Sequence, residues 1–452
     1  MRMSGKKCLA LVAVLAAPLL AGQLFTHPAL GATADATSAV RKGPDAIGDF
    51  STDAPGVRRL ITFDDLPQPY ATPSIDSGAE KVPPRPGATP LVPQGFTVEP
   101  LAHEGILNPR KIITAPNGDL FVAESEPGNV KILHQGQNGK LESSSVFASG
   151  LHQPFGLAFY PPGPDPQYLY VGNTDGVVRF AYKNGDIKAS APFEKIADLP
   201  GGGRLRGGGH WTRDVVFTLD GKKMLVSVGS HSNVDDDPNG LEKNRADVLE
   251  YNPDGSGFRI YAAGIRNAVG LAIEPNTGQL WGSVNERDRL GDNLPCDYIT
   301  HIQEGGFYGW PWYYLGNHQD PRHAGKHPEL ADKVIVPDVL IQAHSASLCM
   351  TFYQGSQFPE QYRGQAFAAE HGSWNRKKRT GYKVIYAEMK DGKATGVYVD
   401  FMTGFVNPNA TVWGRPVGVT VDSKGSLIVS DDGSNTIWRV TYTGAAPATG
   451  GQ

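Results

Sequence analysis

The chain has 452 residues, of which 42 are Lys or Arg and 46 are Asp or Glu, so its formal net charge at pH 7 is −4. This balance lacks the basic excess typical of nucleic-acid-binding proteins, and we predict no nucleic-acid partner. The 55 Gly and 35 Pro residues argue against a helical bundle and favour many short strands joined by turns. Beyond the N-terminus, no stretch of about 18 apolar residues predicts a membrane span.

Residues 1–34 have the pattern of a signal peptide. Basic residues at positions 2, 6 and 7 precede an apolar stretch over residues 9–21, and small residues around Ala34 fit a cleavage site. We therefore expect cleavage near Ala34 and a periplasmic or secreted protein. A retained membrane anchor is the alternative, and peripheral association with a membrane stays open.

Two cysteines, Cys296 and Cys349, remain after the signal segment. In an oxidising compartment such a pair can form one disulfide. A chain of this size needs no covalent link, so two buried thiols are the equal alternative.

Residues 35–95 form a lead-in rich in Ala, Pro, Ser and Asp, which we expect to run as extended chain over a surface. From there to residue 445 one unit recurs six times: a polar residue, a Pro/Gly or small-residue cluster, an apolar strand, a turn with Gly and a second apolar strand. The units begin at residues 108, 153, 210, 267, 344 and 415.

Paired strands in units of about 40–50 residues are typical of propeller blades, with longer intervals marking loop insertions. We predict an all-β fold, a six-bladed β-propeller over residues 96–445, followed by a flexible tail at 446–452. A β-sandwich is the alternative, but it does not require the same strand–turn–strand pattern six times.

The first position of every repeat is polar. If the strand that follows is the innermost one of its blade, these side chains surround one mouth of the central channel, and we predict a binding site there. The alternative is that residues just before a strand are often polar. This explains the Asn and Gln residues of the set well, but the two His residues and the Arg less well. The six residues are Asn108, Gln153, His210, Asn267, His344 and Arg415.

Several common catalytic motifs are absent from the sequence. There is no strand-to-helix GxGxxG, no GxSxG and no HExxH, so we predict neither a nicotinamide or flavin Rossmann site nor the corresponding hydrolase sites. An oxidoreductase with this sequence needs another cofactor. The run 285–297 is rich in side-chain oxygens and suits a hard cation such as Ca²⁺, although a solvated acidic loop is the alternative reading.

Six segments together resemble the glucose/sorbosone dehydrogenase family over about residues 95–442. The lead-in segment DDLPQPYATPS at 64–74 is more similar to the sorbosone branch than to the glucose branch. The resemblance implies a soluble six-bladed propeller that uses pyrroloquinoline quinone (PQQ) and Ca²⁺. The six segments are His210 with its following strand, GIRNAVGLA at 264–272, NERD at 285–288, EGGFYGWP at 304–311, EHGSWNR at 370–376 and WGRPVGV at 413–419.

The same resemblance implies roles for individual residues. His210 matches the catalytic base, Arg266 would stabilise a developing oxyanion, and Arg266 with Asn267 matches the pair that contacts the cofactor. The carboxylates of PQQ need guanidinium partners. Further predicted cofactor contacts are Asn285, His344, Arg376 (with Arg379 as its alternative) and Arg415, and the predicted calcium ligands are the backbone carbonyls of Glu286 and Arg287.

We therefore predict a quinoprotein that oxidises an aldose or a sorbosone-type sugar aldehyde by hydride transfer to PQQ. Ca²⁺ would polarise the quinone, while His210 removes the hydroxyl proton of a small sugar substrate. The electron acceptor is not specified by the sequence. Two alternatives remain: a non-catalytic propeller that binds ligands or proteins, and a Ca²⁺-dependent propeller lactonase, which would need carboxylates converging on the metal.

Overall fold

The computed structural model describes residues 39–205, 208–235 and 239–444. All of them belong to one compact unit, Thr33–Gln452. The predicted signal peptide (1–34) and tail (446–452) lie outside the described residues, so both stay predictions. Within the described part of the chain, no helix is long and apolar enough to cross a membrane.

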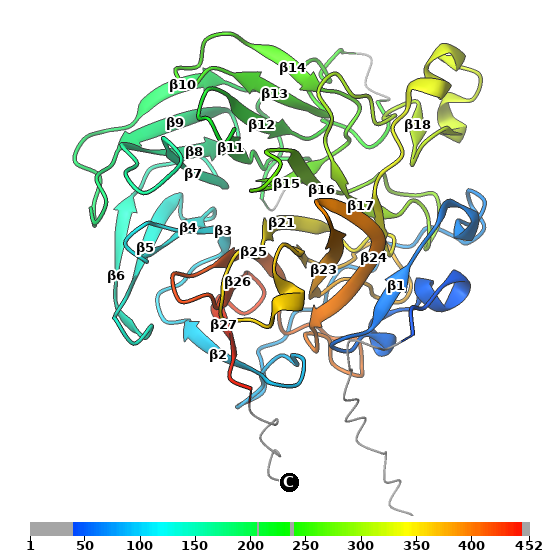
Figure 1. Cartoon of the computed structure of the whole chain (residues 1–452). Helices are drawn as coiled ribbons and strands as arrows, with labels where there is room; N and C mark the ends of the chain where they lie inside the picture. Colours follow the sequence, from blue (N-terminus) through cyan, green and yellow to red (C-terminus); the bar gives the residue numbers. More distant parts are fainter. Residues whose placement is uncertain (1–38, 206–207, 236–238, 445–452) are drawn as a thin grey trace, which may run out of the picture. The chain divides into compact units, whose positions relative to one another are not determined.

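Six antiparallel sheets, each built mainly from strands consecutive in the chain, form a six-bladed β-propeller, and the predicted fold is confirmed (Figure 1). In each sheet the first strand of the repeat lies innermost. The first three sheets consist of β3 (Pro109–Thr114), β4 (Leu120–Glu124), β5 (Asn129–Gln135) and β6 (Leu141–Ala148); β7 (Gly156–Tyr160), β8 (Tyr168–Asn173), β9 (Gly176–Ala181) and β10 (Glu194–Asp198); and β11 (Val215–Phe217), β12 (Met224–Val228), β13 (Asp247–Tyr251) and β14 (Arg259–Ala262).

The other three sheets include strands that are distant in the chain. They consist of β15 (Ala268–Ile273), β16 (Leu280–Val284), β17 (Asp297–His301) and β20 (Val339–Ile341); β21 (Ser347–Phe352), β22 (Ala366–Glu370), β23 (Lys383–Lys390) and β24 (Lys393–Met402) with β1 (Arg58–Leu60); and β25 (Pro416–Val421), β26 (Leu427–Asp431) and β27 (Thr436–Tyr442) with β2 (Phe96–Ala102).

The ring of sheets closes through β2. This strand precedes the first sheet in the chain, yet it pairs antiparallel with β27 as the outermost strand of the sixth sheet. The innermost strands contact one another in chain order, and β25 in turn contacts β3. Closure of this kind leaves only short outer edges, which limits unpaired backbone groups.

The turn between the first two strands of a blade depends on glycine. Gly118 and Gly425 have φ values of 93° and 86°, a region that is costly for residues with a Cβ. Each glycine allows the chain to reverse, so that the apolar residues of both strands face the packed layers between blades. The repeating Gly in the sequence thus has a conformational cause.

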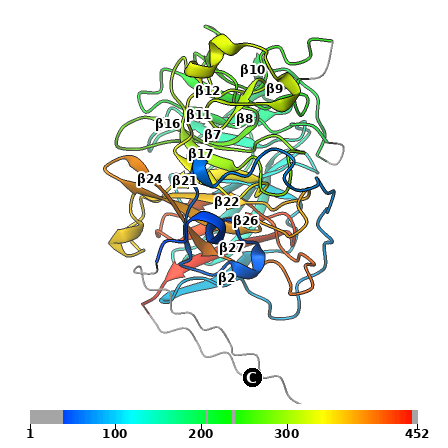
Figure 2. The same cartoon turned by 90° about the vertical axis from the view of Figure 1, so that its right-hand side faces the viewer.

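The lead-in packs against the propeller as a strap, the name used below for residues 39–92. Its strand β1 extends the outer edge of the fifth sheet by pairing with β24. The fully buried Arg59 holds it there through an ion pair to Asp400 in β24 (2.6 Å), and it also pairs with Asp53 of the strap itself (2.8 Å). Figure 2 faces this side, with the strap in blue. Its 3-10 helices are η1 (Gly43–Ile47), η2 (Phe50–Thr52) and η3 (Phe63–Asp65).

The long interval before the fifth repeat holds an inserted segment of short elements. Its two strands form a separate two-stranded sheet and add nothing to the ring itself. The elements are β18 (Tyr313–Tyr314), β19 (His318–Gln319), η4 (Pro321–His323) and η5 (Pro328–Lys333); η6 (Glu360–Tyr362) follows later, between β21 and β22.

Both cysteines that follow the signal segment are buried free thiols. Of the two alternatives left by the sequence, the structure therefore has the second. Burial raises the pKa of Cys349 to about 12, which keeps this thiol protonated and unreactive.

Candidate active site

A cavity of about 870 Å³ lies where the innermost strands begin. Five of the six first-position residues line it, because each stands a few residues before its innermost strand. The sixth, Gln153, is not among the lining residues; its side chain bonds Thr174 and the backbone N–H of Leu205. The five lining residues are Asn108, His210, Asn267, His344 and Arg415.

The imidazole of His210 has a defined tautomer. Its Nδ1 lies 2.9 Å from the carbonyl oxygen of Ser230, which only accepts, so Nδ1 carries the proton. Nε2 is then an unprotonated acceptor. Burial and, next, the charge of Arg266 lower the pKa of His210 well below 6.5, so the ring is neutral at neutral pH. Within the described part of the chain Nε2 has no hydrogen-bond partner, and a neutral His with such an acceptor nitrogen is a suitable general base.

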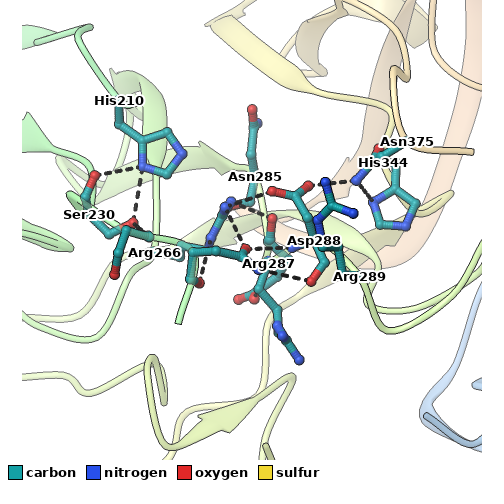
Figure 3. A network of polar contacts seen from close by, with 12 residues as sticks. His210, Ser230, Arg266, Asn285, Arg287, Asp288, Arg289, His344 and Asn375 are labelled. Carbon is teal, nitrogen blue, oxygen red and sulfur yellow. Dashed lines mark hydrogen bonds and ion pairs between the residues drawn. The ribbon is translucent and has the colours of Figure 1, made fainter. Parts of the chain in front are cut away.

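Arg266 is buried in a shell of oxygen atoms beside His210 (Figure 3). Its Nη2 donates to Oδ1 of Asn233 and to the Asp288 carboxylate, each at 3.0 Å. Its Nη1 donates to the backbone carbonyls of Asn285 and Glu286. This guanidinium is therefore fixed, and its charge is balanced by Asp288.

Gly229 allows His210 and Asn267 to lie close together. A Cβ at position 229 would stand 2.3 Å from Oδ1 of Asn267 and 2.6 Å from Cβ of His210, far inside van der Waals contact. Oδ1 of Asn267 is buried without a hydrogen-bond partner among the described residues. An acceptor of this kind in a cavity wall can bind a ligand N–H or O–H.

His344 and Asn285 line the cavity, but polar atoms of both side chains are already hydrogen-bonded within the protein. Nε2 of His344 donates to the carbonyl of Gly291 at 2.9 Å. Its Nδ1 accepts from Asn375 at 3.1 Å, a contact that Figure 3 shows. The amide nitrogen of Asn285 donates to the carbonyl of Ser347. His344 is therefore placed to hold the neighbouring loops, since both of its ring nitrogens are occupied.

Arg415 lies in the sixth repeat, opposite the third repeat that carries His210. Its Nη2 donates to Nδ1 of His371 at 2.9 Å, and Nε2 of His371 donates to Asp432 at 2.7 Å. Asp432 also pairs with Arg110. Among the residues that the structure describes, no carboxylate pairs with Arg415 itself, so its charge is available to an anion in the cavity.

Lining residues that were not singled out from the sequence include His371, Trp374 and Lys81. His371 and Trp374 lie within a segment that was noted, EHGSWNR, but a motif gives no direction to its side chains. Lys81 comes from the strap, where no repeat position marks it. A signal that could have found His371 is its place directly after β22, at the same end of the ring as the first positions.

The role predicted for Arg376 stays a prediction, and its side chain is not among the described residues that line the cavity. Its guanidinium donates to the backbone carbonyls of Ile47 and Gly48 in the strap. The alternative, Arg379, likewise donates to the carbonyls of Ser77 and Gly78. Neither is among the residues around the cavity as described. Both arginines hold the strap, since carbonyl oxygens of a chain without ladder partners need donors.

One of the two predicted calcium ligands, the backbone carbonyl of Glu286, contacts a different cation. The Glu286 carbonyl accepts from Arg266, and the Arg287 side chain pairs with Asp320 at 3.1 Å. Within the described residues, no group of three or more His, Cys, Asp or Glu could hold a metal. The oxygens of this loop thus fit a guanidinium in the present arrangement and not an ion at the Glu286 carbonyl.

Residues 90–303 and 319–443 match the family model TrAA12-like. The chain belongs to this family. The match confirms the resemblance to the soluble PQQ-dependent sugar dehydrogenases, while the sorbosone branch stays a prediction.

The chain covers different shares of the length of its relatives. An uncharacterised protein of Borreliella burgdorferi is 30% identical over 380 residues, which are 82% of this chain and 94% of that protein. A pyrroloquinoline quinone-dependent pyranose dehydrogenase of Coprinopsis cinerea is 24% identical over 79% of this chain but only 55% of its own length. The chain thus spans about half of that enzyme.

Two solved structures share the fold. The holo form of the pyranose dehydrogenase PQQ domain from Coprinopsis cinerea has a TM-score of 0.64 at 22% identity and covers 81% of this chain and all of that chain. A calcium structure of a family AA12 enzyme from Trichoderma reesei has a TM-score of 0.66 at 18% identity and covers 81% of this chain and 98% of its own.

Proposed function

We propose that this protein is a PQQ-dependent sugar dehydrogenase in which His210 is the catalytic base. The observation that carries the proposal is the geometry of His210: Nδ1 is bound to the Ser230 carbonyl, and Nε2 is left as an acceptor beside the fixed Arg266 guanidinium. This pair provides a group to take a proton and, beside it, a positive charge that adds to burial in lowering the pKa of that group, so that its acceptor nitrogen stays unprotonated.

The cavity offers two polar groups that suit a planar quinone with carboxylates. Arg415 has an uncompensated guanidinium, and Asn267 offers a buried acceptor without a partner in the described chain. PQQ when bound would supply a two-electron acceptor for hydride. Because the third and sixth repeats face each other across the ring, a ligand clamped at Arg415 can extend toward His210.

The chain's own residues perform three tasks in this scheme. His210 takes the proton of the substrate hydroxyl on Nε2, while Ser230 fixes the ring by holding Nδ1–H. Arg266 keeps Nε2 of His210 unprotonated, because its charge adds to burial in lowering the pKa of the imidazole. Proton removal by a positioned base contributes roughly 10²–10⁴-fold to the rate.

The substrate class that we propose is an aldose or a sorbosone-type sugar aldehyde, the latter reacting as its hydrate to give the acid. The support for the sorbosone branch is the segment 64–74 of the lead-in. The signal-peptide pattern supports export, and an exported enzyme needs an acceptor outside the cytoplasm.

Calcium is a separate proposal with its own test. The family resemblance and the calcium structure of the Trichoderma reesei relative support it. Since Arg266 holds the loop oxygens, we derive no step through the ion. Chelation followed by addition of Ca²⁺ decides the matter: loss and recovery of turnover would support a required ion, and unchanged turnover in metal-free protein would remove it.

Reconstitution of purified protein with PQQ, followed by dye reduction with a panel of sugars, tests the proposed function. We expect turnover that needs both PQQ and a sugar. A ligand- or protein-binding propeller without catalysis would show no such turnover. A lactonase would instead hydrolyse lactones without a dye, and the absence of a carboxylate cluster suited to a metal in the described ranges favours the oxidoreductase.

A further inference from the structure

The strap contributes a cation to the cavity. Lys81 lines the cavity from a segment that lies before the family match, which begins at residue 90. Its backbone is fixed, because Val82 N–H donates to the Val412 carbonyl and Val412 N–H donates to the Glu80 carbonyl, each at 2.9 Å. The exposed Lys81 therefore stands at the mouth, next to the segment that leads into Arg415.

Charge pairing separates Lys81 and Arg415 from the other cations of the cavity. Arg110 is neutralised by Asp432, and Arg266 by Asp288. No carboxylate of the described chain pairs with Lys81 or with Arg415. Two positive charges that border the same segment, and that the protein leaves uncompensated, favour an anionic ligand between them.

The strap is anchored on both sides of Lys81. Upstream, Arg379 donates to the carbonyls of Ser77 and Gly78 at 2.9 and 3.0 Å. Downstream, Leu91 and Thr403 exchange two backbone hydrogen bonds at 2.9 and 3.0 Å. The position of Lys81 is therefore set by the fold and does not depend on a free end.

We propose that Lys81, together with Arg415, forms a carboxylate-binding site at the mouth of the cavity, built by the strap. The inference rests on the proposed function for the identity of the ligand. A carboxylate can come from two sources with the same chemistry: the cofactor, or an acidic sugar and the acid formed from a sugar aldehyde. In either case Lys81 is a binding residue that takes no part in proton transfer.

The test compares Lys81→Met, which removes the charge, with Lys81→Arg, which keeps it. Lys42→Met is the matched control, because Lys42 is an exposed lysine of the same strap that does not line the cavity. Apo-protein is titrated with PQQ and with citrate, and reconstituted protein is assayed with glucose and with glucuronate, at low and at high salt.

If Lys81 binds the cofactor, Lys81→Met raises the dissociation constant for PQQ by about fivefold or more, Lys81→Arg restores it, and high salt narrows the difference. If it binds the sugar, affinity for PQQ is unchanged and the KM for glucuronate rises while that for glucose does not. Either result supports the site.

The inference would be overturned if the dissociation constants and the KM values were equal in all four proteins. These are wild type, Lys81→Met, Lys81→Arg and Lys42→Met. Wild-type protein that binds no PQQ would refute the proposed function instead, and citrate then still decides the carboxylate site: weaker citrate binding in Lys81→Met supports the site, and unchanged binding overturns it.

Discussion

Arg415 donates from Nη2 to Nδ1 of His371 at 2.9 Å, on the side of the cavity opposite His210. His371 can accept this bond because it is neutral: burial and, next, the charge of Arg415 lower its pKa to about 4. Its other nitrogen donates to Asp432, which fixes the ring. Asp432 and His371 thus orient the guanidinium that we assign to the cofactor.

The first prediction concerns the binding of PQQ by Arg415 and the contact of Arg415 with His371. Arg415→Ala should weaken PQQ binding about 10- to 150-fold, since a charge-assisted contact is lost. His371→Leu should weaken it about tenfold, because Arg415 is then free to turn away. Titration of apo-protein measures both, with the exposed His103→Leu as control. Unchanged affinity in Arg415→Ala would place this arginine outside the cofactor site.

The second prediction concerns the pKa of His210 in the apo-protein. NMR titration should show it well below 6.5, with burial as the largest cause and the charges of Arg266, Arg213 and Arg245 adding to it. Arg266→Met should raise this pKa, because one nearby positive charge is removed. A pKa near 6.5 in wild type, or no change in the variant, would contradict the described arrangement.

The fold could be predicted from the sequence because the pattern of strands and turns that determines it is periodic. Six repeats of one strand–turn–strand pattern imply six blades, and the polar first positions converge because each stands at the same place in its blade. His210, Asn267 and Arg415 reach the cavity for this reason. Gln153 does not, since a partner for its amide is available at Thr174.

The parts of the site outside the repeat could not be predicted in the same way. A loop arginine such as Arg376 can face the cavity or the strap, and only the position of the strap carbonyls decides between them. Lys81 lies in a segment without periodicity, so its approach to Val412 depends on tertiary pairing alone. The Glu286 carbonyl predicted for calcium likewise accepts from Arg266, a contact between two separate loops.

The third prediction uses Gly229. Gly229→Ala should lower turnover at least about tenfold, since the new methyl group must displace His210 or Asn267. The melting temperature should fall by a few degrees. Gly78→Ala is the control, because no atom lies within 4 Å of a Cβ built there. Wild-type turnover in Gly229→Ala would show that this close approach is not needed.

The fourth prediction concerns Glu370, which is fully buried with Oε2 unpartnered in the described structure. Burial raises its pKa from 4.5 to about 8. The folded state therefore binds the proton more tightly than the unfolded state, and the stability contributed is present below about pH 4.5 and lost as pH rises through about 8.

Glu370→Gln should remove this loss of stability at higher pH. At about pH 5 its melting temperature should match wild type within about 1 °C, and at about pH 8.5 it should be higher by several degrees. Calorimetry at the two pH values measures this, with the exposed Glu360→Gln as control. A constant difference at both pH values would show that Glu370 does not titrate in this range.

The central claim, hydride removal assisted by His210, is tested most directly in a single turnover without oxygen. Wild-type protein and His210→Gln, each reconstituted with PQQ, are mixed with a sugar that wild-type protein oxidises, and the absorbance of the bound cofactor is followed. We predict equal cofactor binding in both, rapid reduction in wild type, and reduction about 10²-fold slower or more in His210→Gln. Equal rates in the two proteins, or no sugar-dependent reduction in wild type, would contradict the account.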